Sequence, residues 1–504
     1  MPMNKSINRR DFLKLASLFS MNLAAPKLLF RPGSLESGAG QNVLIIVFDA
    51  FSAAHISLHG YGRETMPNLV RLVERGTIYH QHYANGPFTT PGTASLLTGT
   101  LPMTHRALDH NTKVTDDVAE KSIFHAFNNH HCMAYSHNPL ANTLLKQFLP
   151  AIDDYTPQGK LFLENDLFLD ELKDDDIAPL AWTRSIKQGD DGFSYSLLLS
   201  RLYALLQRGR YRAYEQRYPR GLPSIYEDSF YILDHAMDWL QNLCVTAPQP
   251  FMGYFHFLPP HYPYRTRADF YDQFLNDGFM ALQKPDHIFA VKRSEGKVDE
   301  FRRWYDEFLL HIDSEFARLY HFLEQNEILE NTWLVFTSDH GEMFERGITG
   351  HLTPTMFQPV VRIPLMIFAP GQTTRIDIYD KTNAIDVLPT LMQVTGQEIP
   401  DWIEGHVLPP FSSVPLPADR PIFSVRGKGI PEGQPIHKGS AMLIRVGYKL
   451  IYIFGYVKDL KGGELIELYN IADDPEELND LADLHPEIVN RMLVEIKGQL
   501  ERTE

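Results

Sequence analysis

The chain has 504 residues, of which 44% are hydrophobic and 22% charged, and its formal net charge is −16 at pH 7. This length suits one large α/β domain with a smaller unit, and the composition is that of a folded globular protein. The strong negative charge argues against a general nucleic-acid binder. Cys132 and Cys244 are the only cysteines, too few for a disulfide framework or a thiolate metal site.

The first residues carry a pattern typical of an export signal. Residues 8–14 read Asn-Arg-Arg-Asp-Phe-Leu-Lys, and the weakly apolar run 15–25 follows. The two arginines before Phe-Leu-Lys resemble a twin-arginine signal, which an export receptor reads as an address. We therefore expect residues 1–39 to be a signal and linker, and the mature protein to be periplasmic or extracellular. The apolar run is too short for a comfortable bilayer span, and we expect no integral membrane domain.

Two predicted strands end in side chains that are common metal ligands. Residues 42–49 form a continuous apolar run that predicts a central parallel strand and ends in Asp49. The run 333–336 predicts a second buried strand, which Asp339 and His340 follow. Ligands of open α/β sheets collect at the carboxyl ends of strands, and an adjacent carboxylate and imidazole can hold a divalent metal ion. The alternatives are a helix N-cap for Asp49 and a polar loop for the other two.

A segment rich in Thr, Pro and Gly predicts a helix with hydroxyl side chains at its start. Thr90 fits the N-cap of a helix whose first residue is Pro91, so that Thr89 lies at the positive end of that helix. The free N–H groups there can stabilise an anionic oxygen. From these residues alone, a turn hydroxyl is the simpler explanation of Thr89.

Two histidines of the second half stand in loops. The predicted strand 251–257 leads into a proline-stiffened loop that carries His261, and His351 follows Gly350. The alternative for both is a structural loop histidine. Nearby, residues 301–326 have the apolar stripe of an amphipathic helix, and residues 363–368 predict another strand.

Two regions differ in character from this α/β pattern. Residues 161–227 are charged and aromatic, and we interpret them as a helical insertion near the mouth of the site. Its arginines either meet an anionic substrate or lipid surface or, as is more usual, form a solvated helix face. Within residues 401–504, strands are predicted at 442–446 and 448–454, and a last helix at 488–500. We expect this part to be a small α+β subdomain.

Taken together, these segments resemble the sulfatase family of the alkaline phosphatase superfamily. The resemblance implies an α/β fold with a central, mostly parallel sheet flanked by helices in a catalytic domain of residues 40–400, and a small C-terminal α+β subdomain. The motifs that carry it occur in the family's order: the strand ending in Asp49, Met66 to Gly76, Ala94 to Gly99, Pro260 to Tyr264, Thr337 to Glu342, Arg362 to Leu365, Ile385 to Thr390, and Leu468 to Pro475.

Several positions depart from the family pattern. Thr89 stands where the family has the Cys or Ser that is oxidised to formylglycine, and Thr93 stands where it has an arginine. Threonine cannot become formylglycine. Asp49 is followed by Ala50 rather than a second aspartate, and His340 replaces the asparagine of many sulfatases. The family's lysine after this motif has no clear counterpart.

The resemblance implies a site for one divalent metal ion, with the ligands Asp49, Thr89, Asp339 and His340. The ion would lower the pKa of the Thr89 hydroxyl and make it a nucleophile. An imidazole ligand favours Mn²⁺ or Zn²⁺, with Ca²⁺ as the alternative. His261 and His351 would bind oxygens of the substrate, and one of them would act as general acid.

The predicted function is metal-dependent hydrolysis of an anionic ester through Thr89. A formylglycine hydrate releases sulfate when its hemiacetal collapses, whereas a sulfated threonine has no such exit. A phosphothreonine can be opened by water at phosphorus, so a phosphate ester is favoured over a sulfate ester. The substrate is expected to be anionic and either glycan-linked or lipid-linked. The sequence does not indicate an oligomeric state.

Two other interpretations stay open. One is a phospho-group transferase of the phosphoethanolamine transferase type, although the membrane helices common in those enzymes are not seen. The other is a catalytically silent sulfatase-fold protein that binds glycans or anionic ligands. The lost cysteine and arginine favour the silent protein, and the retained metal set argues against it.

Overall fold

The computed structural model describes residues 40–110, 112–163, 214–225, 229–291, 295–431 and 433–502. The predicted signal at 1–39 and most of the predicted insertion at 161–227 therefore lie outside the described residues. From Gly40 onward the chain forms one compact unit. Among the described residues, no helix is long and apolar enough to cross a bilayer.

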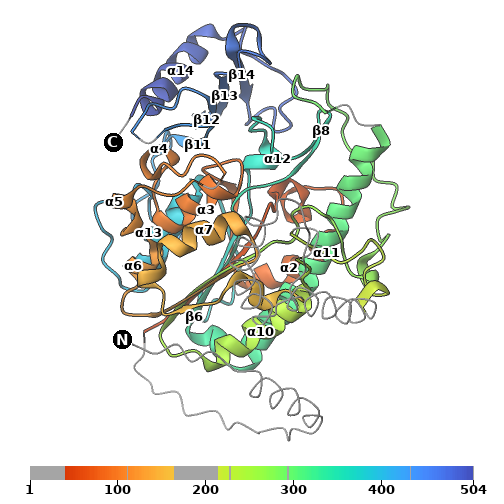
Figure 1. The fold of residues 1–504 in the computed structure, drawn as a ribbon, viewed down its shortest axis with the longest axis vertical. Coiled ribbons are helices and arrows are strands. Elements are labelled where there is room, and N and C mark those ends of the chain that lie inside the picture. The colour runs from red at the N-terminus through yellow and green to blue at the C-terminus, as the bar shows by residue number, and fades with distance from the viewer. Residues whose placement is uncertain are drawn as a thin grey trace, which may run out of the picture. The chain divides into compact units, whose positions relative to one another are not determined.

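The centre of this unit is an eight-stranded sheet with the order β10-β2-β9-β6-β1-β5-β3-β4 (Figure 1). Strand β9 runs antiparallel to β2 and β6, and the other neighbouring pairs are parallel. The predicted mostly parallel sheet is thus confirmed. Its strands are β1 (Asn42–Phe48), β2 (Thr77–Tyr83), β3 (His131–Ser136), β4 (Asp154–Tyr155), β5 (Phe251–Phe257), β6 (Thr332–Thr337), β9 (Leu365–Phe368) and β10 (Ile376–Asn383).

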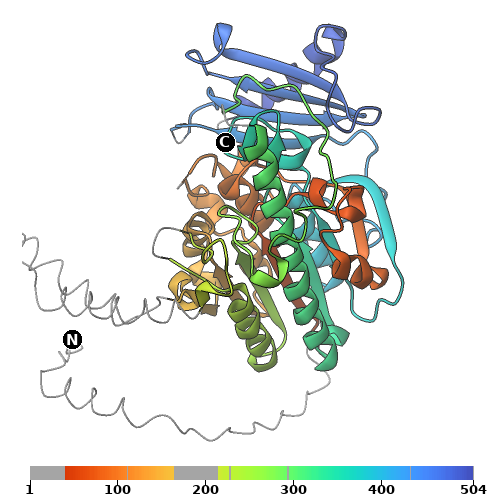
Figure 2. The ribbon, with the colours of Figure 1, turned by 90° about the vertical axis from the view of Figure 1, so that its right-hand side faces the viewer.

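Helices cover both faces of the sheet (Figures 1 and 2). Because side chains alternate along a strand, Leu44 and Ile46 of β1 enter one core, and Val43 and Ile45 enter the other. The first core is closed by α2 (Pro67–Leu72), α10 (Leu233–Thr246) and α11 (Glu295–Gln325). The second is closed by α3 (Thr89–Thr98), α6 (Ile123–Ala126), α7 (Pro139–Gln147) and α13 (Val387–Val394). Burial on both faces explains why the central strands are continuously apolar.

The start of α3 corrects one prediction. The helix begins at Thr89, with Phe88 as its extended N-cap residue, and not at Pro91 with Thr90 as the cap. Proline is tolerated anywhere in the first turn, because the first N–H groups of a helix have no partner within the helix. Thr89 still lies at the positive end of α3, as predicted. Helix α11 also begins earlier than expected, at Glu295 rather than 301.

The C-terminal part forms the expected α+β subdomain. Strands β11 (Ile422–Gly427), β12 (Gly439–Arg445), β13 (Tyr448–Phe454) and β14 (Glu464–Asn470) make an antiparallel sheet, and α14 (Pro486–Leu500) packs on one face. The other face packs against residues of the hairpin β7 (Met343–Glu345) and β8 (Ile348–Gly350) and of α12 (Gln358–Val361). The domain boundary at residue 401 stays a prediction.

A buried ion pair in the C-terminal subdomain connects its sheet to α12 and the β7–β8 hairpin. Lys449 of β13 and Glu477 are both fully buried, and their Nζ and Oε1 atoms are 2.6 Å apart. Glu477 Oε2 also accepts a hydrogen bond of 2.8 Å from the backbone N–H of Gln358, at the start of α12. Arg346, in the turn of the β7–β8 hairpin, donates to the backbone carbonyl of Glu477. The C-terminal sheet therefore holds the β7–β8 hairpin and the start of α12 in place.

We predict that Lys449→Met lowers the free energy of unfolding by about 3–5 kcal/mol, because it leaves a carboxylate buried without its partner. Lys449→Met combined with Glu477→Gln is expected to recover much of this loss. Denaturant unfolding of the full chain measures both changes. Arg75→Met is the control, since its pair with Glu324 is largely exposed and is worth less than about 1 kcal/mol. Equal losses for Lys449→Met and Arg75→Met would contradict the prediction.

Candidate active site

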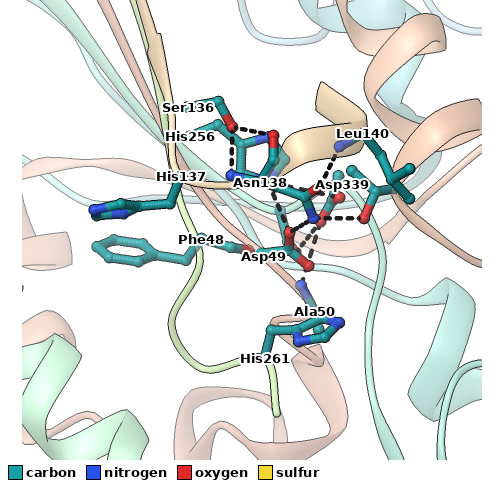
Figure 3. Close-up of polar contacts among 12 residues, drawn as sticks. Phe48, Asp49, Ala50, Ser136, His137, Asn138, Leu140, His256, His261 and Asp339 are labelled. Carbon is teal, nitrogen blue, oxygen red and sulfur yellow. Dashed lines mark hydrogen bonds and ion pairs between the residues drawn. The ribbon is translucent and has the colours of Figure 1, made fainter. Parts of the chain in front are cut away.

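Strand register brings the polar side chains to one edge of the central sheet. Val47 of β1 pairs with Thr337 of β6, so Asp49 and Asp339 each lie two residues beyond a paired position. Strand β3 lies on the other side of β5, and its Ser136 is two residues before Asn138. Figure 3 shows the side chains of Asp49, Asn138 and Asp339 pointing toward one another. The carboxyl ends of parallel strands therefore form the floor of the site.

The floor holds two fully buried carboxylates beside a buried imidazole. His340 Nε2 lies 3.4 Å from Asp49 Oδ1 and 3.6 Å from Asp339 Oδ2. Burial and the charge of Asp49 raise the pKa of Asp339. Burial acts against the charged form of His340, but the two carboxylates outweigh it and raise its pKa to about 9. Burial would likewise raise the pKa of Asp49, but the imidazoles of His256 and His340 hold it well below its usual range.

The carboxylates have oxygens that the protein leaves unused. Asp49 Oδ1 and Asp339 Oδ2 are buried and make no hydrogen bond to any residue that the structure describes. Ligand atoms of Asp49, Asp339 and His340 lie within 4.8 Å of one another, close enough to share one metal ion. A divalent cation would satisfy both oxygens and offset the repulsion between the carboxylates. This donor set fits a divalent metal ion.

Thr89 faces this group from the start of α3. Its Oγ1 lies 3.4 Å from His340 Nε2 and accepts a hydrogen bond of 3.1 Å from Asn138 Nδ2. Asn138 Nδ2 also donates to Asp49 Oδ2, at 2.5 Å. The structure thus brings together the four predicted ligands, Asp49, Thr89, Asp339 and His340, and adds Asn138 between them.

Of the two predicted substrate-binding histidines, His351 lies beside His340, and His261 lies beside His351. The His351 ring centroid is 4.2 Å from that of His340 and 5.1 Å from that of His261. His351 is buried and its Nδ1 lies 2.9 Å from Glu342 Oε1, whereas His261 is partly exposed and donates from Nδ1 to the Tyr262 carbonyl at 2.7 Å. Burial and the neighbouring His340 lower the pKa of His351 to about 4. The three rings lead from the buried floor toward solvent.

Sequence reasoning missed Asn138 and His256. Asn138 stands between a strand and Pro139, which is a pattern typical of a helix N-cap, and its Oδ1 does cap α7 through a 2.7 Å bond from Leu140 N–H. Nothing in that pattern shows that its amide nitrogen turns to Asp49 and Thr89. His256 is hidden within the apolar strand β5. Glu342, the last residue of the Thr337 to Glu342 motif, holds His351.

The C-terminal subdomain reaches the same site through Arg426 of β11. Its Nη1 donates to the carbonyl of Leu352, next to His351, at 2.9 Å. Its guanidinium carbon lies 4.9 Å from the ring centroid of Phe88, next to Thr89. One cation therefore holds the segments that carry Thr89 and His351.

Comparison with known proteins places this site in a family context. The family model described as Sulfatase matches residues 41–397. The multifunctional alkaline phosphatase superfamily protein PehA of Trinickia caryophylli is 25% identical over 428 residues, which cover 75% of this chain and 78% of PehA. The choline-sulfatase of Rhizobium meliloti is 25% identical over 407 residues, covering 73% of this chain and 71% of that protein.

A solved structure supports the same fold. The phosphonate monoester hydrolase of Agrobacterium radiobacter superimposes with a TM-score of 0.65 at 19% identity, over 92% of this chain and 97% of that chain. The family match spans most of the described α/β unit and includes every predicted site residue. The chain therefore belongs to the sulfatase family and is an ester hydrolase.

Proposed function

We propose that this protein hydrolyses an anionic phosphate ester through Thr89 as a nucleophile, with one divalent metal ion as cofactor. The observation that carries the proposal is the position of Thr89 Oγ1, between Asn138 and His340 and beside two buried carboxylates. The substrate would be glycan-linked or lipid-linked, and a sulfate ester is the alternative.

Asp49, Thr89, Asp339 and His340 would hold the ion, which would acidify the threonine hydroxyl and neutralise charge on the transferring group. The imidazole ligand favours Mn²⁺ or Zn²⁺ over Ca²⁺. The residues themselves orient the nucleophile: Asn138 donates to Oγ1 and to Asp49, which fixes the side-chain rotamer of Thr89 relative to the floor. Free N–H groups of the first turn of α3 add positive potential at the same point.

The first step forms a bond from Thr89 Oγ1 to phosphorus and breaks the bond from phosphorus to the leaving oxygen. A bound ion would favour loss of the Thr89 hydroxyl proton to solvent before the attack. His261 is the candidate general acid for the leaving oxygen: its Nδ1 is held by the Tyr262 carbonyl, so Nε2 is the atom that can give a proton to substrate.

The second step breaks the bond from Thr89 Oγ1 to phosphorus when water attacks. Glu342 accepts from Nδ1 of His351, so the Nε2 of a neutral His351 is a proton acceptor. His351 is therefore the candidate general base for this water. Inorganic phosphate leaves, or a phosphate monoester if the substrate was a diester. His351 passes the proton taken from water to Thr89 Oγ1, and His261 recovers its proton from solvent. A sulfated threonine would be harder to open, which is why phosphate is preferred here.

We predict that Thr89→Ala lowers kcat/KM for aryl phosphate monoesters and diesters by about 10³-fold or more, whereas Thr89→Ser retains part of the activity because it keeps the hydroxyl. Turnover of these substrates and of an aryl sulfate by metal-loaded protein is the measurement. Thr93→Ala, one helical turn further along α3, is the matched control. Dominant sulfate turnover would contradict the phosphate preference, and full activity of Thr89→Ala would contradict the nucleophile.

We also predict that Mn²⁺ or Zn²⁺ stabilises the protein against heat, by about 2.7 kcal/mol at a hundredfold excess over the dissociation constant. Asp339→Asn is expected to abolish this shift, because it removes a charged ligand. The control is Asp234→Asn: Asp234 groups with His311 and Glu315, but Arg267 already neutralises this cluster. If the metal-dependent shift were lost in Asp234→Asn and retained in Asp339→Asn, the ion would be bound by the Asp234 cluster, and the proposed site would be contradicted.

A further inference from the structure

We infer that His256 is an additional ligand of the metal ion, so that two imidazoles and two carboxylates surround it together with Thr89. This inference rests on the metal site of the proposed function and extends it. His256 belongs to strand β5 and lies at the centre of the floor, paired in register with Val47 on one side and Ser136 on the other. Its side chain is fully buried.

His256 makes the same approach to the carboxylates as His340 does. Its Nε2 is 3.2 Å from Asp49 Oδ2 and 3.6 Å from Asp339 Oδ2. The corresponding distances from His340 Nε2 are 3.4 Å and 3.6 Å, to Asp49 Oδ1 and Asp339 Oδ2. Two imidazole nitrogens therefore face the same carboxylate pair at nearly equal separations.

These separations are compatible with ligand atoms that share one ion. Bonds of about 2.0–2.1 Å to Zn²⁺ put neighbouring ligand atoms of a five-coordinate site about 2.9–3.6 Å apart. The four separations of 3.2, 3.4, 3.6 and 3.6 Å lie in this range. Direct charged hydrogen bonds are shorter, at about 2.7–2.9 Å.

The hydrogen bonds of the two rings point to the same role. His340 Nδ1 lies 2.9 Å from the carbonyl of Gly341, and His256 Nδ1 lies 3.1 Å from the hydroxyl oxygen of Tyr254. The Gly341 carbonyl can only accept, so it holds Nδ1–H of His340 and leaves the Nε2 lone pair facing the carboxylates, as is usual for metal-binding histidines. The Tyr254 hydroxyl oxygen can hold Nδ1–H of His256 in the same way. Among the described residues, Nε2 of His256 has no hydrogen-bond partner although it is buried.

A second imidazole changes which ion the site prefers. Ca²⁺ is bound by oxygen ligands, whereas imidazoles suit Zn²⁺ and Mn²⁺. With two imidazoles we expect discrimination against Ca²⁺, and His256→Asn is expected to weaken Zn²⁺ binding by more than about 100-fold while changing Ca²⁺ binding little.

The test is X-ray absorption spectroscopy of the full chain loaded with Zn²⁺, which counts bound imidazoles without reference to activity. The inference predicts two for the unaltered protein and one for His256→Asn. His340→Asn should also give one, and His351→Asn, which alters the adjacent ring, should leave two.

A count of one imidazole in the unaltered protein would overturn the inference, and so would a count of two that falls to one in His351→Asn but not in His256→Asn. A count of two that falls to one in His256→Asn and in His340→Asn, in a protein that turns over no ester, would sustain the ligand assignment and defeat the proposed function. A protein that binds no Zn²⁺ would defeat both.

Discussion

The site depends on two buried carboxylates that the register of the central sheet brings together. Strands β1 and β6 are parallel neighbours, so Asp49 and Asp339 leave the sheet at the same edge and in the same direction. Both are fully buried, and like charges in such a place are costly unless a cation offsets them. Protonated imidazole can do this in part, as the raised pKa of His340 shows. A divalent ion would do so fully, and ligand atoms of Asp49, Asp339 and His340 lie close enough to share one.

Separate parts of the chain each hold one side chain of this edge in position. Asn138 ties the start of α7 to Thr89 and Asp49, so that one amide positions both the proposed nucleophile and a proposed metal ligand. The β7–β8 hairpin places Glu342 and His351 beside His340. Arg426 of the C-terminal sheet donates to the carbonyl of Leu352 and so connects that sheet to the segment of His351. A substitution in that subdomain is therefore expected to act on the active site without touching substrate.

Much of this was visible in the sequence, and the reasons for the rest are physical. Asp49, Asp339 and His340 follow strands so continuously apolar that their burial and direction were readily predicted. Thr89 was placed correctly at the helix start, although Pro91 is compatible with several positions of the first turn and the cap was misassigned. The edge strand β10 was not predicted, because its sequence is mostly polar and carries three charged residues.

Asn138 and His256 were not predicted as site residues, for a different reason. An Asn before Pro is fully explained by capping α7, and its second role exists only because β3 ends level with β1. A histidine within the apolar run of β5 has no local signal at all, since its partners come from strands over 80 residues away along the chain. Such residues are defined by register between distant segments, which local periodicity does not encode.

The stereochemical course at phosphorus tests the central claim most directly. Attack by Thr89 followed by attack of water comprises two in-line displacements, so hydrolysis of a chiral phosphorothioate ester in isotopically labelled water should proceed with net retention of configuration. Net inversion would show that water attacks the substrate in a single step, and would contradict a threonine nucleophile.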